Sequence, residues 1–101
     1  MKLGGEPQLQ VRILSPTRTY YDSTALSVSA KNKVGPFDIL AGHANFFSLL
    51  TKGDVSVNSG SRILTFPVTQ GIMKVTRNTV TLFVDLEPTH VVAEQQSPVA
   101  H

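Results

Sequence analysis

The 101-residue chain carries nine Lys and Arg against seven Asp and Glu, a net charge of +2, and it contains no cysteine. This length is that of one domain, whose core must form without disulfides, and the lack of thiols excludes thiolate metal sites and cysteine nucleophiles. No apolar run approaches the roughly 18 residues of a membrane-spanning helix, and the first residues lack the apolar stretch of a secretory signal. The basic side chains are scattered, so the mild positive charge does not indicate nucleic-acid binding.

Alternating apolar and polar residues predict short β-strands through the first half of the chain. Residues 9–13 alternate until Ser15-Pro16-Thr17 breaks the pattern, and residues 26–30 alternate up to a turn at 31–33. A third alternating run covers 54–58. Alternation of this kind is typical of strands that bury one face only.

The second half adds one strand with a proline and one hairpin. Residues 62–68 are apolar enough for a strand, but Pro67 cannot donate to a ladder and predicts a strand end, an edge or a bulge. Residues 72–75 and 79–84 are predicted to pair across Thr76-Arg77-Asn78, whose asparagine tolerates positive φ. Short strands about ten residues apart predict an all-β fold, a small antiparallel β-sandwich of about eight to ten strands.

Three segments do not fit the strand pattern. Residues 46–50 are predicted to hold at most a helical turn. Residues 1–7 and 87–101 show no periodicity, and we expect loosely ordered tails around one domain at 8–86. Within the second tail, residues 90–96 are long enough for two helical turns, which are marginal in isolation.

Residues able to carry catalysis are few. The histidines His43, His90 and His101 lack metal-ligand spacing, and no Walker A, Gly-x-Gly-x-x-Gly or Gly-x-Ser-x-Gly motif is present. Asp38, His43 and Ser48 have the side chains of an Asp-His-Ser catalytic triad, but their spacing in the sequence does not show that they meet. We therefore expect no enzyme activity and no cofactor.

Most aromatic residues have apolar neighbours and are expected in the core. Phe46-Phe47 differs, because adjacent residues point in opposite directions and one ring is then left for a partner. Alternatively, Tyr20, Tyr21 and Phe46 line a groove, which would make the chain a generic β-sandwich module that binds a peptide or a glycan.

The segment from Gly35 to Gly53 reads GPFDILAGHANFFSLLTKG. A glycine before His43 permits a turn that a β-carbon would block, so the histidine is expected to brace the loop or to face a protein partner. The segment resembles the signature of the ε subunit of F-type ATP synthases, Gly-x-Phe/Leu-Gly-Ile/Leu-Leu-Pro-Gly-His-Ala-Pro-Leu-Leu-Thr-x-Leu-x-x-Gly. Flanking strands match in order, and the resemblance covers residues 8–86.

This resemblance implies a non-catalytic rotor subunit that needs no cofactor. It would couple the γ subunit to the polar loops of the c-ring in a proton- or sodium-translocating synthase, peripheral at the cytoplasmic face of the bacterial inner membrane. The signature assigns the γ-facing surface to Ser15, Gly42, His43 and Ser48. It assigns the c-ring side to Lys33, Val34, Pro36 and Asp38.

The chain departs from the signature at several positions. Asp38 stands where glycine is common, Ala41 where proline is common, and Asn45-Phe46-Phe47 where Pro-Leu-Leu is common. Pro36 stands where an acidic residue often helps to meet the ring. Many family members continue into a two-helix hairpin that restrains ATP hydrolysis, and residues 87–101 are too few for it, so hairpin-based inhibition and nucleotide binding are not expected.

Overall fold

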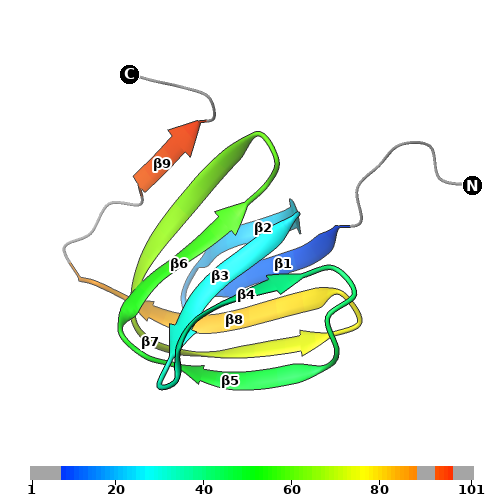
Figure 1. The fold of residues 1–101 in the computed structure, drawn as a ribbon. Coiled ribbons are helices and arrows are strands. Elements are labelled where there is room, and N and C mark those ends of the chain that lie inside the picture. Colours follow the sequence, from blue (N-terminus) through cyan, green and yellow to red (C-terminus); the bar gives the residue numbers. More distant parts are fainter. Residues whose placement is uncertain (1–7, 89–92, 97–101) are drawn as a thin grey trace, which may run out of the picture.

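The computed structural model describes residues 8–88 and the strand at 93–96. These residues form nine strands and no helix. The described part of the chain therefore contains no helix that could cross a membrane. The strands are β1 (Leu9–Leu14), β2 (Thr19–Ala25), β3 (Ser27–Asn32), β4 (Gly35–Leu40), β5 (Phe46–Leu50), β6 (Gly53–Asn58), β7 (Arg62–Thr76), β8 (Thr79–Leu86) and β9 (Ala93–Gln96) (Figure 1). The predicted all-β sandwich is confirmed.

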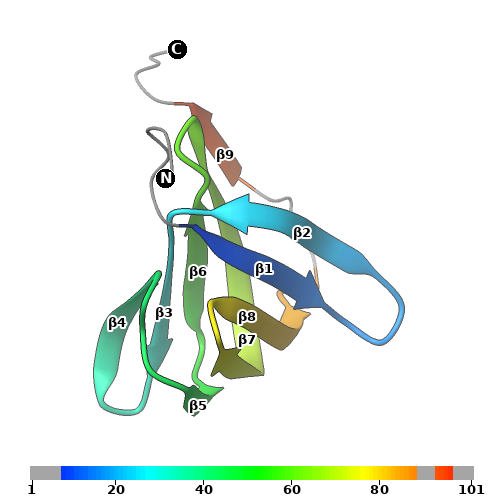
Figure 2. The same ribbon diagram turned by 90° about the vertical axis from the view of Figure 1, so that its right-hand side faces the viewer.

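One long strand, β7, belongs to both layers of the sandwich. Its first half pairs with β6 and β9, and its second half pairs with β5 and β8. The order β2-β1-β8-β7-β6-β3-β4 therefore folds over at β7, and β1 and β2 cross β3 and β6 at a steep angle (Figure 2). One pair departs from the antiparallel expectation, because β1 lies parallel to β8.

The fold-over in β7 coincides with a local irregularity. The register with β8 shifts between Val68 and Gln70, next to Pro67. Of the strand end, edge or bulge that the proline predicts, the structure therefore has a bulge beside it. The Gln70 amide donates to a carboxylate oxygen of Asp85 at 3.0 Å. A β-carbon on Gly71 would lie 2.8 Å from the carbonyl oxygen of residue 83, so the strands approach closely here only because this residue is glycine.

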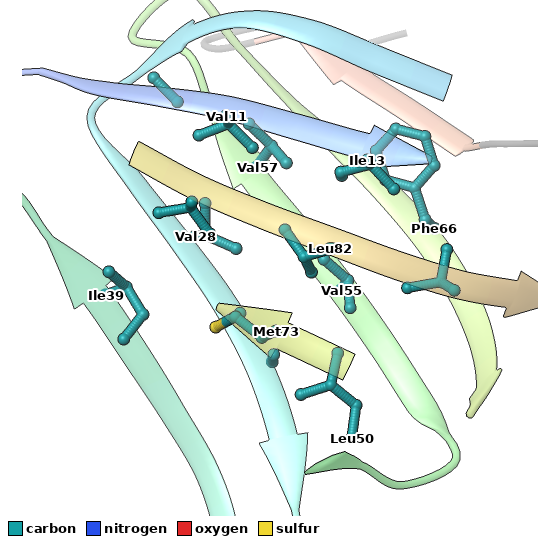
Figure 3. Packing of buried hydrophobic residues seen from close by; sticks show 14 of the residues in the cluster. Val11, Ile13, Val28, Ile39, Leu50, Val55, Val57, Phe66, Met73 and Leu82 are labelled. Carbon is teal, nitrogen blue, oxygen red and sulfur yellow. The ribbon is translucent and has the colours of Figure 1, made fainter. Parts of the chain in front are cut away.

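The core consists of the inward-facing alternate residues of both layers. Burying each of the larger side chains stabilises the fold by about 1.5–3 kcal/mol. The buried residues include Val11, Ile13, Val28, Ile39, Leu50, Val55, Val57, Phe66, Met73 and Leu82 (Figure 3). The alternating runs that predicted β1, β3 and β6 supply half of these positions, namely Val11, Ile13, Val28, Val55 and Val57.

Several sequence expectations were wrong. Residues 46–50 form strand β5 and not a helical turn. Residues 93–96 pair with Arg62–Thr65 as β9, so this part of the segment 90–96 forms a strand and not a helical turn, while 90–92 lie outside the described residues. The strands β2 and β4 had not been assigned, and the supposed loop from Gly35 is mostly β4. His90, His101 and residues 1–7 lie outside the described residues.

Candidate protein-interaction site

The loop between β4 and β5 is bound to the turn between β7 and β8. Gly42 has a φ of 87°, and the turn residues Arg77 and Asn78 have φ values of 50° and 62°. Two central residues at positive φ define a type I′ hairpin, as expected from Asn78. A residue with a β-carbon would be strained at the φ of Gly42, so this position favours glycine.

Two asparagines join this loop and this turn in a reciprocal clamp. Asn78 Oδ1 accepts the Gly42 backbone N–H at 2.7 Å, and Asn45 Oδ1 accepts the Arg77 backbone N–H at 3.4 Å. The Asn78 carbonyl also accepts the Gln10 N–H at 2.8 Å, at the start of β1. The turn thereby orients the segment that carries the histidine.

His43 is braced within the loop and is also exposed. Its backbone N–H donates to the Leu40 carbonyl at 3.1 Å, which braces the loop. Its ring packs edge-on against Phe46 with centroids 5.5 Å apart, and the residue is exposed. Phe46 in turn packs on Phe37. The imidazole is therefore held on an aromatic support and stays accessible to solvent.

Asp38, His43 and Ser48 have the side-chain types of a catalytic triad, but the structure does not bring them together. Asp38 accepts the Ser29 hydroxyl at 2.6 Å, and Ser48 donates to the Leu49 carbonyl at 3.1 Å while accepting the Asn32 side-chain amide at 3.1 Å. Within the described ranges, no group of three His, Asp or Glu side chains is arranged to hold a metal ion. This arrangement offers no catalytic constellation.

The four γ-facing candidates do not form one patch. Gly42 and His43 lie together beside the β7–β8 turn. Ser15 lies at the other end of β1, where its hydroxyl accepts the backbone N–H groups of Thr17 and Arg18. Ser48 is only 8% exposed, and its hydroxyl accepts the Asn32 side-chain amide, which links β5 to β3.

The four ring-side candidates share one hairpin, formed by β3 and β4. Lys33 and Val34 form its tip, and Val34 is 95% exposed. Asn32 Oδ1 accepts the Val34 and Gly35 N–H groups, which fixes the tip. Pro36 and Asp38 follow on β4, both exposed. The tertiary structure thus presents these candidates as one projecting surface.

Sequence reasoning missed an apolar row on the outer face of the other layer. Leu49, Ile72 and Phe83 are neighbours across β5, β7 and β8. Leu49 is 65% and Phe83 is 53% exposed, against the expectation that Phe83 is in the core. With Pro16, the row lines an open groove of about 480 Å³. Phe47, 62% exposed, lies two positions from Leu49 on the same face of β5 and confirms that one of the two adjacent rings stays outside.

A signal for this row exists in the sequence. Consecutive apolar residues on a strand point to opposite faces of the sheet, so both faces must find apolar surroundings. Such pairs or runs occur at Leu49-Leu50, Ile72-Met73 and Leu82-Phe83-Val84. One face fills the core. The other face is exposed over three adjacent strands, and contiguous exposed apolar surface marks an interaction site.

The aromatics of the rival groove are engaged within the protein. Tyr20 packs on Phe66 with ring centroids 6.5 Å apart, and the Tyr21 hydroxyl donates to the Thr24 carbonyl at 2.7 Å. Burial raises the pKa of the Tyr21 phenol, and a hydrogen bond with Ser23 opposes this shift. These rings do not converge with Phe46, and a peptide or glycan groove is not favoured.

The fold and the site define a β-sandwich with an exposed apolar row on one layer and a projecting hairpin on the other, with no assembled catalytic group among the described residues. The family described as "ATP synthase, Delta/Epsilon chain, beta-sandwich domain" matches residues 8–86. The chain belongs to this family.

Named relatives agree with this assignment. The chain is 35% identical over 77 residues to an ATP synthase epsilon chain of Cyanothece sp., covering 76% of this chain and 56% of the relative. It is 34% identical to the epsilon chain of Francisella tularensis subsp. holarctica, with 76% and 53% covered. The chain therefore spans about half the length of these relatives.

Solved structures share the fold. A chain of the Euglena gracilis mitochondrial ATP synthase (OSCP/F1/c-ring) superposes with a TM-score of 0.71 at 18% identity, covering 80% of this chain and 53% of that one. A chain of the Tetrahymena thermophila mitochondrial ATP synthase central stalk and c-ring gives 0.66 at 18% identity, with 83% and 69% covered. At this identity the likeness concerns the fold alone.

Proposed function

We propose that the chain is a non-catalytic rotor component of an F-type ATP synthase, joining the γ subunit to the c-ring. The observation that carries the proposal is the exposed apolar row of Leu49, Ile72 and Phe83 on a domain of the Delta/Epsilon family. A role in torque transmission needs a stiff body with two separate contact surfaces. A continuous core shared by two layers through β7 supplies such a body.

The proposed γ-facing surface centres on the apolar row. Ser15, with its neighbour Pro16 in the groove, borders one end of this layer, and Gly42 and His43 border the other. Ser48 contributes from inside, because its hydrogen bond to Asn32 holds β5 in place. Apolar contact at the centre with polar groups at the rim is the usual anatomy of a protein interface.

The proposed ring-facing surface is the β3–β4 hairpin with Lys33, Val34, Pro36 and Asp38. Its tip carries the almost fully exposed Val34 beside Lys33. This pair offers one apolar and one charged group for contact with the loops of the c-ring. With the ring in the membrane, this domain would be peripheral at the cytoplasmic face of the bacterial inner membrane, held there through the complex.

Gel filtration with the cognate γ subunit tests the γ-facing half of the proposal. The wild-type chain should co-elute with γ, and Phe83→Asp should abolish the complex, because it buries a carboxylate at the centre of an apolar contact. Val34→Asp is the matched control, since it makes the same change at an exposed apolar residue of the other hairpin. A wild-type chain that fails to bind γ, or a Phe83→Asp chain that binds normally, contradicts the proposal.

A further inference from the structure

The outer face of the β1-β8-β7-β5 layer is organised in registered rows. The apolar row runs Leu49–Ile72–Phe83 and continues to Leu14 on β1. The next row toward the β7–β8 turn runs Phe47–Lys74–Thr81–Arg12. Because successive outward residues on a strand are two positions apart, these rows lie side by side on one surface.

Charge is distributed unevenly along this surface. Lys74 and Arg77 lie on the turn side, where they line a shallow hollow of about 420 Å³ together with Thr76, Thr79 and Thr81. The opposite side of the apolar row carries Asp85, whose carboxylate accepts the Gln70 amide. The face is therefore positive at one border of the apolar row and negative at the other.

The two cations of the hollow have no counter-charge within ion-pair distance among the described residues. Across the part of the chain that the structure describes, the ion pairs are Arg12 with Asp22 at 3.8 Å and Lys52 with Glu87 at 3.7 Å. Arg12 is thus neutralised locally, whereas no carboxylate among these residues lies within 4 Å of Lys74 or Arg77. The hollow is lined otherwise by threonines, which can donate hydroxyl hydrogen bonds to an acidic group.

We propose that Lys74 and Arg77 receive a pair of acidic side chains of the γ subunit and so fix the direction in which γ lies across the apolar row. This inference rests on the proposed function, because it names γ as the occupant. An apolar strip alone can accept a partner in two opposite orientations. Charges of opposite sign at its two borders favour one of them and accelerate encounter, since like charges at an interface repel.

Carbodiimide coupling of the complex with γ, followed by peptide mass spectrometry, tests the inference. This reagent joins an amine to a carboxylate that touches it, so a peptide containing Lys74 should be linked to an Asp- or Glu-containing peptide of γ. Lys74→Arg is the matched control: it keeps the charge and the complex but removes the amine, and the link should vanish. A complex that forms without any Lys74 link overturns the inference and leaves the proposed function intact.

Association kinetics give an independent readout. Lys74→Glu should lower the association rate with γ by about tenfold at low salt, and the deficit should shrink as salt screens it. Lys33→Glu makes the same change of net charge on the other layer and should alter the rate much less. Equal effects of the two variants, or no effect of Lys74→Glu, would overturn the inference. Absence of binding by the wild-type chain removes both the proposed function and this inference.

Discussion

Asn78 performs two tasks that substitution can separate. Its backbone adopts a φ of 62°, and its side-chain oxygen accepts the Gly42 N–H at 2.7 Å. Asn78→Gly keeps the backbone conformation and removes the acceptor. Asn78→Asp keeps an acceptor oxygen at the same place. The pair of variants therefore tests whether the clamp orients the loop that carries His43.

The expected magnitude follows from the two contributions. An intramolecular hydrogen bond contributes about 0.5–1.5 kcal/mol net. Glycine also raises the conformational entropy of the unfolded chain, which costs about 0.4–1 kcal/mol of stability. This cost is partly offset because glycine adopts a positive φ without the steric strain of a β-carbon. Asn78→Gly should thus lower the free energy of unfolding by about 1 kcal/mol, a fall in Tm of roughly 4–8 °C for a domain of this size. Asn78→Asp should stay within about 0.5 kcal/mol of wild type.

Thermal unfolding followed by circular dichroism measures the change in stability of the whole domain. Amide hydrogen exchange at Gly42 measures the opening of the hydrogen bond between the Gly42 N–H and Asn78. Exchange at Gly42 should accelerate in Asn78→Gly and remain slow in Asn78→Asp. The reasoning is refuted if both variants expose the Gly42 amide equally, or if Asn78→Gly leaves its exchange unchanged.

The remaining predictions concern the core, the interface and pH. Gly71→Ala should lower the urea midpoint, because a β-carbon 2.8 Å from the Phe83 carbonyl forces a shift that costs about 1–3 kcal/mol; an unchanged midpoint would contradict the close approach. Leu82→Ala should cost about 2–5 kcal/mol in urea unfolding, since the side chain is fully buried, and a loss below that range would argue against a close-packed site. His43→Ala should weaken the γ complex in gel filtration with little change in Tm, because the backbone hydrogen bond to Leu40 remains; a large fall in Tm would instead show that the ring contact with Phe46 stabilises the loop. Burial raises the pKa of Tyr21, so its contribution to stability is complete below about pH 10 and is lost as pH rises through the folded-state pKa. Tyr21→Phe should flatten that alkaline decline in urea titrations, and an identical decline in both proteins would contradict it.

Strands that bury one face only could be predicted from the sequence. Leu9 to Ile13 and Asp54 to Asn58 alternate because inward residues meet the core and outward residues meet water. The β7–β8 turn was predictable too, since positive φ restricts the residues that suit it. By contrast, β5 escaped prediction because Leu49 and Leu50 are apolar on both faces and hide the period of two.

The composition of the contact surfaces required the tertiary structure. Nothing local relates Leu49 to Phe83, which become neighbours of Ile72 only through the strand register. The amide of Asn78 meets Gly42 across 36 positions of sequence.

The β class of the fold, the turn at Gly42 and the family resemblance could therefore be read from the amino-acid sequence alone. These depend on backbone preferences, on local periodicity and on a short motif, all of which are encoded within a few neighbouring residues. By contrast, the burial of Ser48, the exposure of Phe83 and the clamp of two asparagines on the His43 loop emerge only from the folded arrangement of the strands. Exposure and long-range hydrogen bonds depend on which distant strands pair and in what register, and β7 sets both by crossing from one layer to the other.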